Sequence, residues 1–440
     1  MAVVQQRPYI TIYEKGISST KLVEFSDINP QDPYGQDPNY PYPKNTPKKS
    51  IGLGILQPTV CRTTEVLNGT YELYLEHPII ENDPRASYIK VDNIIRADGQ
   101  YFRIRKVNKK LSKNGDKVLA ANALHIWYDL GDRFISKYDL DGWMPYWFLY
   151  NMFYGNPPVM SEEIDQNLMP TYNFIWRTTC EANPDPSVSP GYAHFKDTNP
   201  VACFIGTENA FVSIYQKEIN GEIRTPELHR DNFIFRFDWR KYGAVDNAFN
   251  IIHKIDMTDI TENIDIQNLI TRLYAKDNYG HSTYLKIDAN AISAAGGWLP
   301  AHHRTKAVEF QYNSGENDQY AAQRFAVDAE RYFKQVSTVK LSYKCNYAEL
   351  SNTELYKDYI AAKHCNVGDT GTIVCEALGI TANNMEVIKK EKDVLKNETI
   401  SLEFGTKSAS LTDPKFMSQT VNNSKFNYSE VLPIGNVPNS

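Results

Sequence analysis

The sequence predicts a β-rich, multi-domain α+β protein, in which two small β-barrel or sandwich domains flank mixed α+β domains. Three observations support this fold class. Short runs of β-branched and aromatic residues, separated by turn signals, recur near both ends of the chain. The middle of the chain shows helix-like spacing of apolar residues instead. At 440 residues, the chain is long enough for about two to four domains.

An N-terminal β-domain is expected over residues 1–123. The dipeptides Asn68-Gly69 and Asn114-Gly115 are strong hairpin signals between strand-like runs. The expected strands are 8–13, 21–25, 71–76, 88–91, 93–95, 101–107 and 117–121. Five or more short strands at spacings of roughly ten residues are typical of a small barrel or sandwich.

Residues 29–50 interrupt this strand pattern. The segment holds six prolines and has no periodicity, which predicts an exposed loop. It is either a tolerated surface insertion or an arm that embraces a neighbouring subunit. Because tyrosine combines an apolar body with a polar tip, the second interpretation makes Tyr34, Tyr40 and Tyr42 candidate interface residues.

A mixed α+β domain is expected over residues 124–245. Its expected elements are helices at 124–130, 144–153 and 200–206 and a strand at 233–239. The chain holds 29 Tyr, 19 Phe and 6 Trp, an aromatic content that suits subunit contacts and equally suits strands. We take Trp143 and Trp147, from the aromatic-rich part of this domain, as further candidate interface residues.

Two further domains and a tail complete the expected organisation. Residues 246–335 are expected to form a mixed β domain with a helix at 319–335, where Phe325, Ala329 and Phe333 recur at helical spacing. Residues 336–405 are expected to form a second β-module. Its strands are predicted at 339–343, 370–375, 385–388 and 399–404. Residues 406–440, rich in Ser, Asn, Thr and Pro, are expected to form an extended C-terminal tail.

Charge and cysteine usage limit the function classes. The formal net charge of −6 argues against a general nucleic-acid binder, although an acidic wall would suit a channel that nucleic acid passes through. The six cysteines show no C-x-x-C pair and are expected to be buried free thiols, although Cys365 and Cys375 could face each other across strands. No signal peptide or apolar run of ~18 residues is evident, so the protein is expected to fold in a cytoplasm.

Catalytic constellations are not evident in the sequence. The zinc pattern H-E-x-x-H and the serine pattern G-x-S-x-G are both missing. His302-His303 predicts a solvated turn, and His364-Cys365 has no third group to orient a thiolate–imidazole pair. Acidic residues such as Glu262 have no spacing that makes them catalytic. We therefore expect no catalytic residues, no cofactor-binding residues and no metal ligands.

Several segments, in order, resemble the phage minor structural protein family, also called the prophage tail endopeptidase family. Val66-Leu-Asn-Gly-Thr-Tyr-Glu-Leu-Tyr-Leu-Glu-His-Pro78 is similar to the family's Asn-Gly-x-Tyr-x-Leu strand. Val118-Leu-Ala-Ala-Asn-Ala-Leu-His-Ile-Trp-Tyr-Asp-Leu130 resembles its A-x-H-x-x-Y-D-L element. Further similar segments are 94–107, 250–255, 270–274, 319–335, 356–370 and 402–405. The resemblance runs from roughly residue 66 to residue 405.

The resemblance implies a baseplate hub with the hub fold of contractile phages. In that fold, each chain carries two tube-type β-domains, and three chains form a six-fold-like ring on the hexameric tail tube. The implied partners are two further copies of the chain, the distal tail protein and tail tube, the tape-measure protein, and receptor-binding or other baseplate proteins. DNA would only pass through. The implied location is the distal tail tip of the virion, assembled in the host bacterial cytoplasm.

Two alternative functions stay open at this point. The first is a tail-associated cell-wall hydrolase with a site in the middle region. Longer relatives carry lytic domains after the hub, and we expect none here because the given chain ends at Ser440. The second is a carbohydrate-binding adsorption protein, in which Trp143, Trp147 and Trp176 stack on sugars.

Overall fold

The structure is a computed structural model. It describes residues 9–15, 52–111, 115–153, 175–181, 188, 191–206, 210–219, 222–265, 269–287, 303–310, 318–337, 340–347 and 365–405. Among these, no helix is long and apolar enough to cross a membrane. The expected strand at 21–25, the loop at 29–50 and the tail at 406–440 lie outside the described residues.

The N-terminal β-unit comprises β1 to β7. Its elements are β1 (Ile10–Tyr13), β2 (Gly54–Leu56), β3 (Val60–Val66), β4 (Tyr71–Pro78), α2 (Arg85–Tyr88), β5 (Ile94–Ala97), β6 (Gln100–Leu111) and β7 (Lys117–His125). Strand β4 buries every second side chain, among them Leu73 and Leu75, as expected for a strand with one face on a core. These side chains pack with Ile95, Phe102 and Ile104 in one apolar cluster.

The C-terminal β-unit collects strands from two separate stretches of the chain. Its elements are β15 (Phe249–Ile252), β16 (Met257–Asp265), β20 (Lys340–Tyr347), β21 (Thr370–Cys375), η6 (Glu376–Leu378), β22 (Ile380–Asp393) and β23 (Glu398–Gly405). The strand order is β16-β20-β23-β22-β21-β15. Because β15 and β16 pair with β21 and β20, this unit extends across the boundary expected at residue 336.

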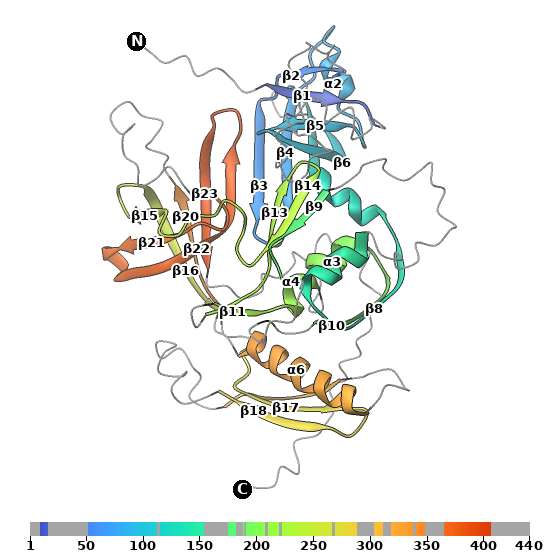
Figure 1. Ribbon diagram of the computed structural model, residues 1–440. Helices are drawn as coiled ribbons and strands as arrows, with labels where there is room; N and C mark the ends of the chain where they lie inside the picture. Colours follow the sequence, from blue (N-terminus) through green and yellow to red (C-terminus); the bar gives the residue numbers. More distant parts are fainter. Residues whose placement is uncertain are drawn as a thin grey trace, which may run out of the picture.

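The two β-units form one continuous sheet of 13 strands, in which β22 pairs with β3. Figure 1 shows the long strands of the C-terminal unit beside the upright strands of the N-terminal unit. Each unit has its own apolar cluster, with Phe102 in the first and Phe404 in the second. The predicted β-rich fold, with a β-unit towards each end of the chain, is therefore confirmed.

The middle region packs aromatic side chains around short elements below the N-terminal unit (Figure 1). These elements are η1 (Ile126–Asp132), β8 (Ile135–Trp143), α3 (Pro145–Phe153), β9 (Ile175–Thr178), β10 (Gly191–Thr198), η3 (Ala202–Gly206), α4 (Phe211–Ile214), β11 (Lys217–Ile219), β12 (Glu222–Arg224), β13 (Glu227–Asp231) and β14 (Ile234–Asp238). Phe148, Phe204, Phe211 and Phe237 are fully buried in its core.

A small three-stranded sheet with one helix forms the remaining part. It consists of β17 (Arg272–Asp277), β18 (Ser282–Lys286), β19 (Thr305–Phe310) and α6 (Asp318–Val336). Leu273 and Ala275 of β17 are buried against Phe325 and Ala329 of α6. In Figure 1, α6 lies between this sheet and the rest of the molecule.

The helix predictions had mixed outcomes. Helices at 144–153 and 319–335 are confirmed. The predicted helix at 200–206 is also helical, and its part Ala202–Gly206 is a π-helix; the Ala202 N–H donates to the Asn199 side chain at 3.0 Å. The helix expected at 124–130 is wrong in its first part. Leu124 still belongs to β7, because it pairs with both β4 and β6, and a 3₁₀ helix begins only at Ile126.

Candidate assembly interface

The joint between the two β-units is an antiparallel strand pair. Its register runs from Lys389 opposite Val66 to Asp393 opposite Arg62. Backbone hydrogen bonds extend it at both ends, from Leu67 N–H to Ile388 O at 2.8 Å and from Val394 N–H to Cys61 O at 2.9 Å. Because main-chain bonds make the joint, the sheet continues from one unit into the other.

Arg230 of β13 anchors the middle region on the N-terminal β-unit. It is only 3% exposed, and its guanidinium donates to Gly69 O at 2.7 Å and to Val66 O at 3.2 Å. Its guanidinium carbon also lies 5.4 to 5.8 Å from the ring centroids of Tyr71, Trp127 and Tyr128. A buried cation that meets carbonyl oxygens and ring faces is held far more firmly than an exposed one.

The β3–β4 turn supplies the other side of this contact. Asn68 has a left-handed backbone, with φ of 49°, which asparagine tolerates better than most residues. Its side-chain amide donates to Pro226 O at 2.9 Å and accepts from Leu228 N–H at 2.7 Å. The turn is thereby fixed to the start of β13, about 160 residues further along the chain.

The segment between β14 and β15 is fastened to both β-units. On one side, the Lys241 ammonium bonds to the Glu65 carboxylate at 2.8 Å. Burial alone would raise the pKa of Glu65, but Lys241 and Arg230 outweigh burial and leave that pKa below its ordinary value. On the other side, the fully buried Asp369 accepts from Val245 N–H at 2.8 Å and from Asn366 N–H at 2.8 Å.

Burial moves the pKa of two histidines and two cysteines away from their ordinary values. Burial lowers the pKa of His125 far below its ordinary value, and burial followed by the Lys241 charge lowers that of His229 to about 4. All six cysteines are buried and free. Burial raises the pKa of Cys180 and of Cys345 to about 12, so neither is a thiolate near neutral pH.

The other histidines and cysteines considered as candidate site residues do not form a common site within the described residues. His303 is exposed and bonds to the Thr271 hydroxyl at 3.2 Å, whereas Cys365 is buried in the C-terminal β-unit. Cys375 belongs to the same apolar cluster as Cys365, and both thiols are free. His302 and His364 lie outside the described residues. In the described part of the chain, no three His, Cys, Asp or Glu side chains are grouped as a metal site would require.

An exposed aromatic patch surrounds α3. We define it as Trp143, Tyr146, Trp147, Tyr150 and Trp176. Trp143, Trp147 and Tyr150 are 37%, 44% and 37% exposed. The ring centroids of Tyr146 and Trp147 lie 5.4 Å apart, those of Trp147 and Tyr150 5.6 Å, and those of Tyr146 and Trp176 5.7 Å. Large aromatic side chains grouped on a surface are typical of protein interfaces.

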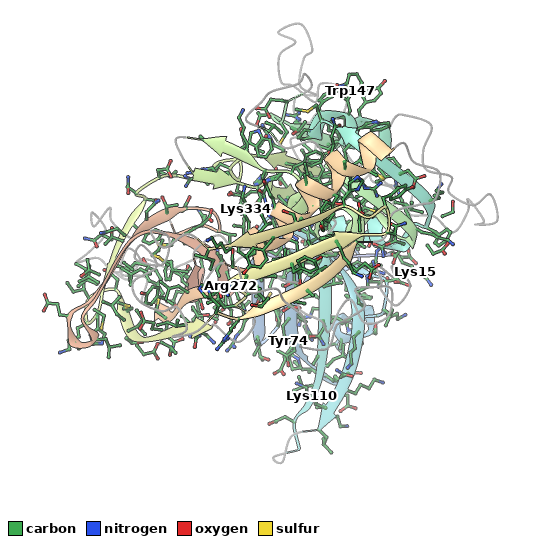
Figure 2. The ribbon with its side chains drawn as sticks, turned by 90° about the horizontal axis from the view of Figure 1, so that it is seen from below. Lys15, Tyr74, Lys110, Trp147, Arg272 and Lys334 are labelled. Atoms are coloured by element: carbon green, nitrogen blue, oxygen red, sulfur yellow. The ribbon has the colours of Figure 1, made fainter. Side chains whose placement is uncertain are left out.

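The predicted interface residues therefore fall into two groups. Trp143 and Trp147 lie in the aromatic patch, and Figure 2 shows Trp147 at one extremity of the molecule. Tyr34, Tyr40 and Tyr42 lie outside the described residues. Arg230 could not be recognised from the sequence, because an arginine in an alternating strand gives no sign of a partner far along the chain. The Asn68-Gly69 turn was recognised, but not its contact with β13.

The fold is similar to that of solved prophage tail proteins. It is similar to the crystal structure of prophage tail protein gp18 from Listeria monocytogenes EGD-e, with a TM-score of 0.50 and 13% identity, over 81% of this chain and 92% of that one. The 43 kDa tail protein of prophage MuSo2 from Shewanella oneidensis gives a TM-score of 0.49 and 9% identity, over 80% and 95%. A tail protein from Neisseria meningitidis MC58 gives 0.48 and 11%, over 80% and 93%.

The sequence identifies the family. Residues 245–415 match the family described as prophage endopeptidase tail, and residues 44–125 match the one described as prophage endopeptidase tail N-terminal domain. The chain belongs to the prophage endopeptidase tail family and is a bacteriophage tail protein. No curated protein matches the sequence. Residues 44–125 contain β2 to β7 of the N-terminal β-unit, and residues 245–415 contain all strands of the C-terminal β-unit, with residues 126–244 between the two matches.

Proposed function

We propose that this tail protein is the structural hub of the tail tip. Three copies form a ring that caps the tail tube, contacts the distal tail protein and tube, and encloses a channel for the tape-measure protein and DNA. The observation that carries this proposal is the joining of two β-units in one sheet. Three such chains offer six β-units in a ring, which fits a six-fold tube.

The buried hydrogen bonds of Arg230 and Asp369 support a structural role. They fasten the middle region and its linker to both β-units, so that the six units of a ring keep a fixed spacing. Each β-unit would supply one tube-type domain of the ring. Residues 1–123 supply one tube-type domain, and 336–405, together with β15 and β16, supply the other. Opening of the channel would then follow from different contact energies between copies in the closed and open states.

Further contacts of the hub involve the exposed surfaces. Trp143 and Trp147 would contact a neighbouring copy or another baseplate protein, since the aromatic patch is exposed on the isolated chain. Tyr34, Tyr40 and Tyr42 would do the same from the 29–50 loop. Assembly would take place in the host bacterial cytoplasm, and receptor-binding proteins would attach at the same tip.

Electron microscopy of virions labelled with antibodies against this chain tests the location. Labels at the distal end of the tail are expected, and labels along the tail shaft or on the capsid would contradict a hub. A non-catalytic role is part of the proposal, although the family description contains the word endopeptidase. Release of muropeptides or peptides from peptidoglycan incubated with the purified protein would contradict that part.

Carbohydrate binding is the second candidate function, and the aromatic patch favours it. Trp147 and Tyr150 expose ring surface on which sugars can stack. Binding to host cell walls that is lost in Trp147→Ala and kept in Tyr242→Ala, another exposed aromatic residue, would favour this function. Equal binding by both variants would exclude the patch as the sugar site.

A further inference from the structure

The strand edges of the large sheet that are open within the described residues include those of β16 and of the outer half of β6. Strand β16 ends the strand order and pairs with β20, and its only other pairing with a described residue is an isolated bridge between Met257 and His253, away from Asp259 and Glu262. Strand β5 pairs with Gln100–Arg103 of β6 only. The outer half of β6, residues 106–111, therefore pairs with β7 on one side and has its other side open. An open edge presents unpaired backbone N–H and C=O groups, to which another strand can add.

The two open edges carry opposite charge. On β16, Asp259 and Glu262 are exposed, and each carboxylate accepts from a neutral donor of β20: Asp259 from the Asn346 amide at 2.7 Å, and Glu262 from the Tyr343 hydroxyl at 2.9 Å. On β6, Lys106 and Lys109 are exposed and form no ion pair with any described residue. Lys110 bonds to Glu76 at 2.7 Å.

The charges also fall on matching faces of the two strands. Glu262 shares the core face of β16 with Ile260, and Lys109 shares the core face of β6 with Val107. Asp259 lies on the other face of β16, and Lys110 lies on the other face of β6. An antiparallel register with Glu262 opposite Lys109 therefore brings Asp259 diagonal to Lys110. Opposite charges in both positions stabilise a strand pair.

The direction of the strands suits the same pairing. Seven consecutive antiparallel steps lead from β16 through β20, β23, β22, β3, β4 and β7 to β6, so β16 and β6 run in opposite senses. Rotation about a ring axis preserves the sense of a strand along that axis. The β16 edge of one copy would therefore meet the β6 edge of the next copy as an antiparallel pair.

We propose that β16 of one copy adds to the outer half of β6 of the next copy, so that the sheet continues from chain to chain. This proposal rests on the proposed ring and names the surfaces that close it. The contact is heterologous, because two different edges meet, and such contacts generate rings when the rotation closes. Figure 2 shows Lys110 on the β6–β7 hairpin, which projects from the molecule and is accessible to a second chain.

Cysteine trapping tests this contact directly. The full-length variant Glu262→Cys with Lys109→Cys places two thiols at an expected cross-strand distance, within the reach of a disulfide. Under mild oxidation at high protein concentration, we expect a covalent species of three chains. Each single variant should stay uncrosslinked, and an equimolar mixture of the two should give covalent pairs only. The native cysteines are buried and do not interfere.

The matched control is Glu262→Cys with Lys286→Cys, because Lys286 is an exposed strand lysine of the separate β17–β18–β19 sheet. It should give no covalent trimer, and equal crosslinking in the control would overturn the proposal. If the test variant has the mass of three chains but does not crosslink, this contact is excluded and the proposed ring is still supported. A mass of one chain without crosslinking would exclude both.

Charge reversal gives a second, independent readout. Lys109→Glu should weaken self-association by about tenfold, since it replaces an attraction by a repulsion at each contact. Combining it with Glu262→Lys should restore association, whereas Lys286→Glu should leave it unchanged. These positions are exposed, so unfolding midpoints should stay the same in all variants. If Lys109 only guards the edge against unwanted pairing, Lys109→Glu will not weaken association, and the proposal fails.

Discussion

The guanidinium carbon of Arg230 lies 5.4 Å from the ring centroid of Tyr71, so a side chain of the middle region completes the packing of the N-terminal β-unit. The same guanidinium bonds to the backbone oxygens of Val66, the last residue of β3, and of Gly69 in the turn that follows. Strand β3 is also the strand that pairs with β22. Three parts of the chain therefore meet at one turn, and the geometry of the hub depends on that turn.

Arg230→Ala should destabilise the protein by about 3 kcal/mol, because it removes charge-assisted hydrogen bonds and the packing of a buried guanidinium against three aromatic rings. Denaturant unfolding with a fluorescence readout measures the change, since Trp127 contacts the guanidinium. Arg62→Ala is the control. Arg62 pairs with Glu391 at 3.5 Å but is half-exposed, so its loss should cost less than about 1 kcal/mol. Equal effects of the two variants would contradict the anchoring role of Arg230.

Asn68→Ala and Asn68→Gly separate the side-chain bonds of this turn from its backbone conformation. Both variants lose the bonds to Pro226 and Leu228, but only alanine is strained at a φ of 49°. We expect Asn68→Ala to be less stable than Asn68→Gly by about 1 kcal/mol. Thermal unfolding of the two proteins under identical conditions provides the comparison. A glycine variant less stable than the alanine variant would contradict the conformational argument.

Asp369→Asn should loosen the C-terminal side of the linker. Asparagine is of the same size, but one of the two acceptor oxygens becomes an NH2 donor, so either Val245 N–H or Asn366 N–H loses its acceptor. The expected loss is about 2 kcal/mol. Hydrogen exchange should then speed up at Val245 and Asn366 more than in the core strand β4. Unchanged protection at Val245 would show that the carboxylate does not anchor the linker.

A fall in pH should destabilise the protein through His229 of β13, which lies near Lys241 and Glu65. The folded-state pKa of His229 is about 4, against an ordinary value of 6.5, so between these values the unfolded chain binds a proton that the folded chain does not. The stability from neutral His229 is therefore complete above pH 6.5 and is lost as the pH falls towards 4, by on the order of 2 kcal/mol.

His229→Gln is the variant that tests this pH dependence. Its unfolding free energy should fall less than that of the unaltered protein between pH 7 and pH 5. Comparing the two differences cancels the contributions of other titrating groups. If both proteins lose the same free energy over this range, His229 does not take up the proton on unfolding.

Trp147→Ala should leave the fold intact but impair assembly. The Trp147 side chain is 44% exposed, so its removal should cost less than about 1 kcal/mol of unfolding free energy. If the patch contacts a neighbouring protein, incorporation of the variant into tails should drop severalfold in complementation of a phage lacking the gene. Tyr242→Ala, at another exposed aromatic residue, should assemble normally. Normal assembly of both variants would remove Trp147 from the interface.

Local patterns predicted much of the fold, because strands and amphipathic helices reveal themselves within a few residues. The alternation at 71–76 and the helical spacing at 319–335 each correspond to an observed element. Contacts between distant segments leave no local trace. Nothing near Met257 indicates that β16 pairs with β20, some 80 residues later. The aromatic residues around α3 were identified by composition, whereas Arg230 could be found only in three dimensions.

The central claim is that three copies of this chain form a ring. Light scattering coupled to size-exclusion chromatography, at high protein concentration and with the tail tube protein added, measures the mass of the assembly directly. The hub predicts a species that contains three times the 50.3 kDa of one chain. A mass of 50.3 kDa that persists at every concentration, with and without the tube protein, would contradict the ring.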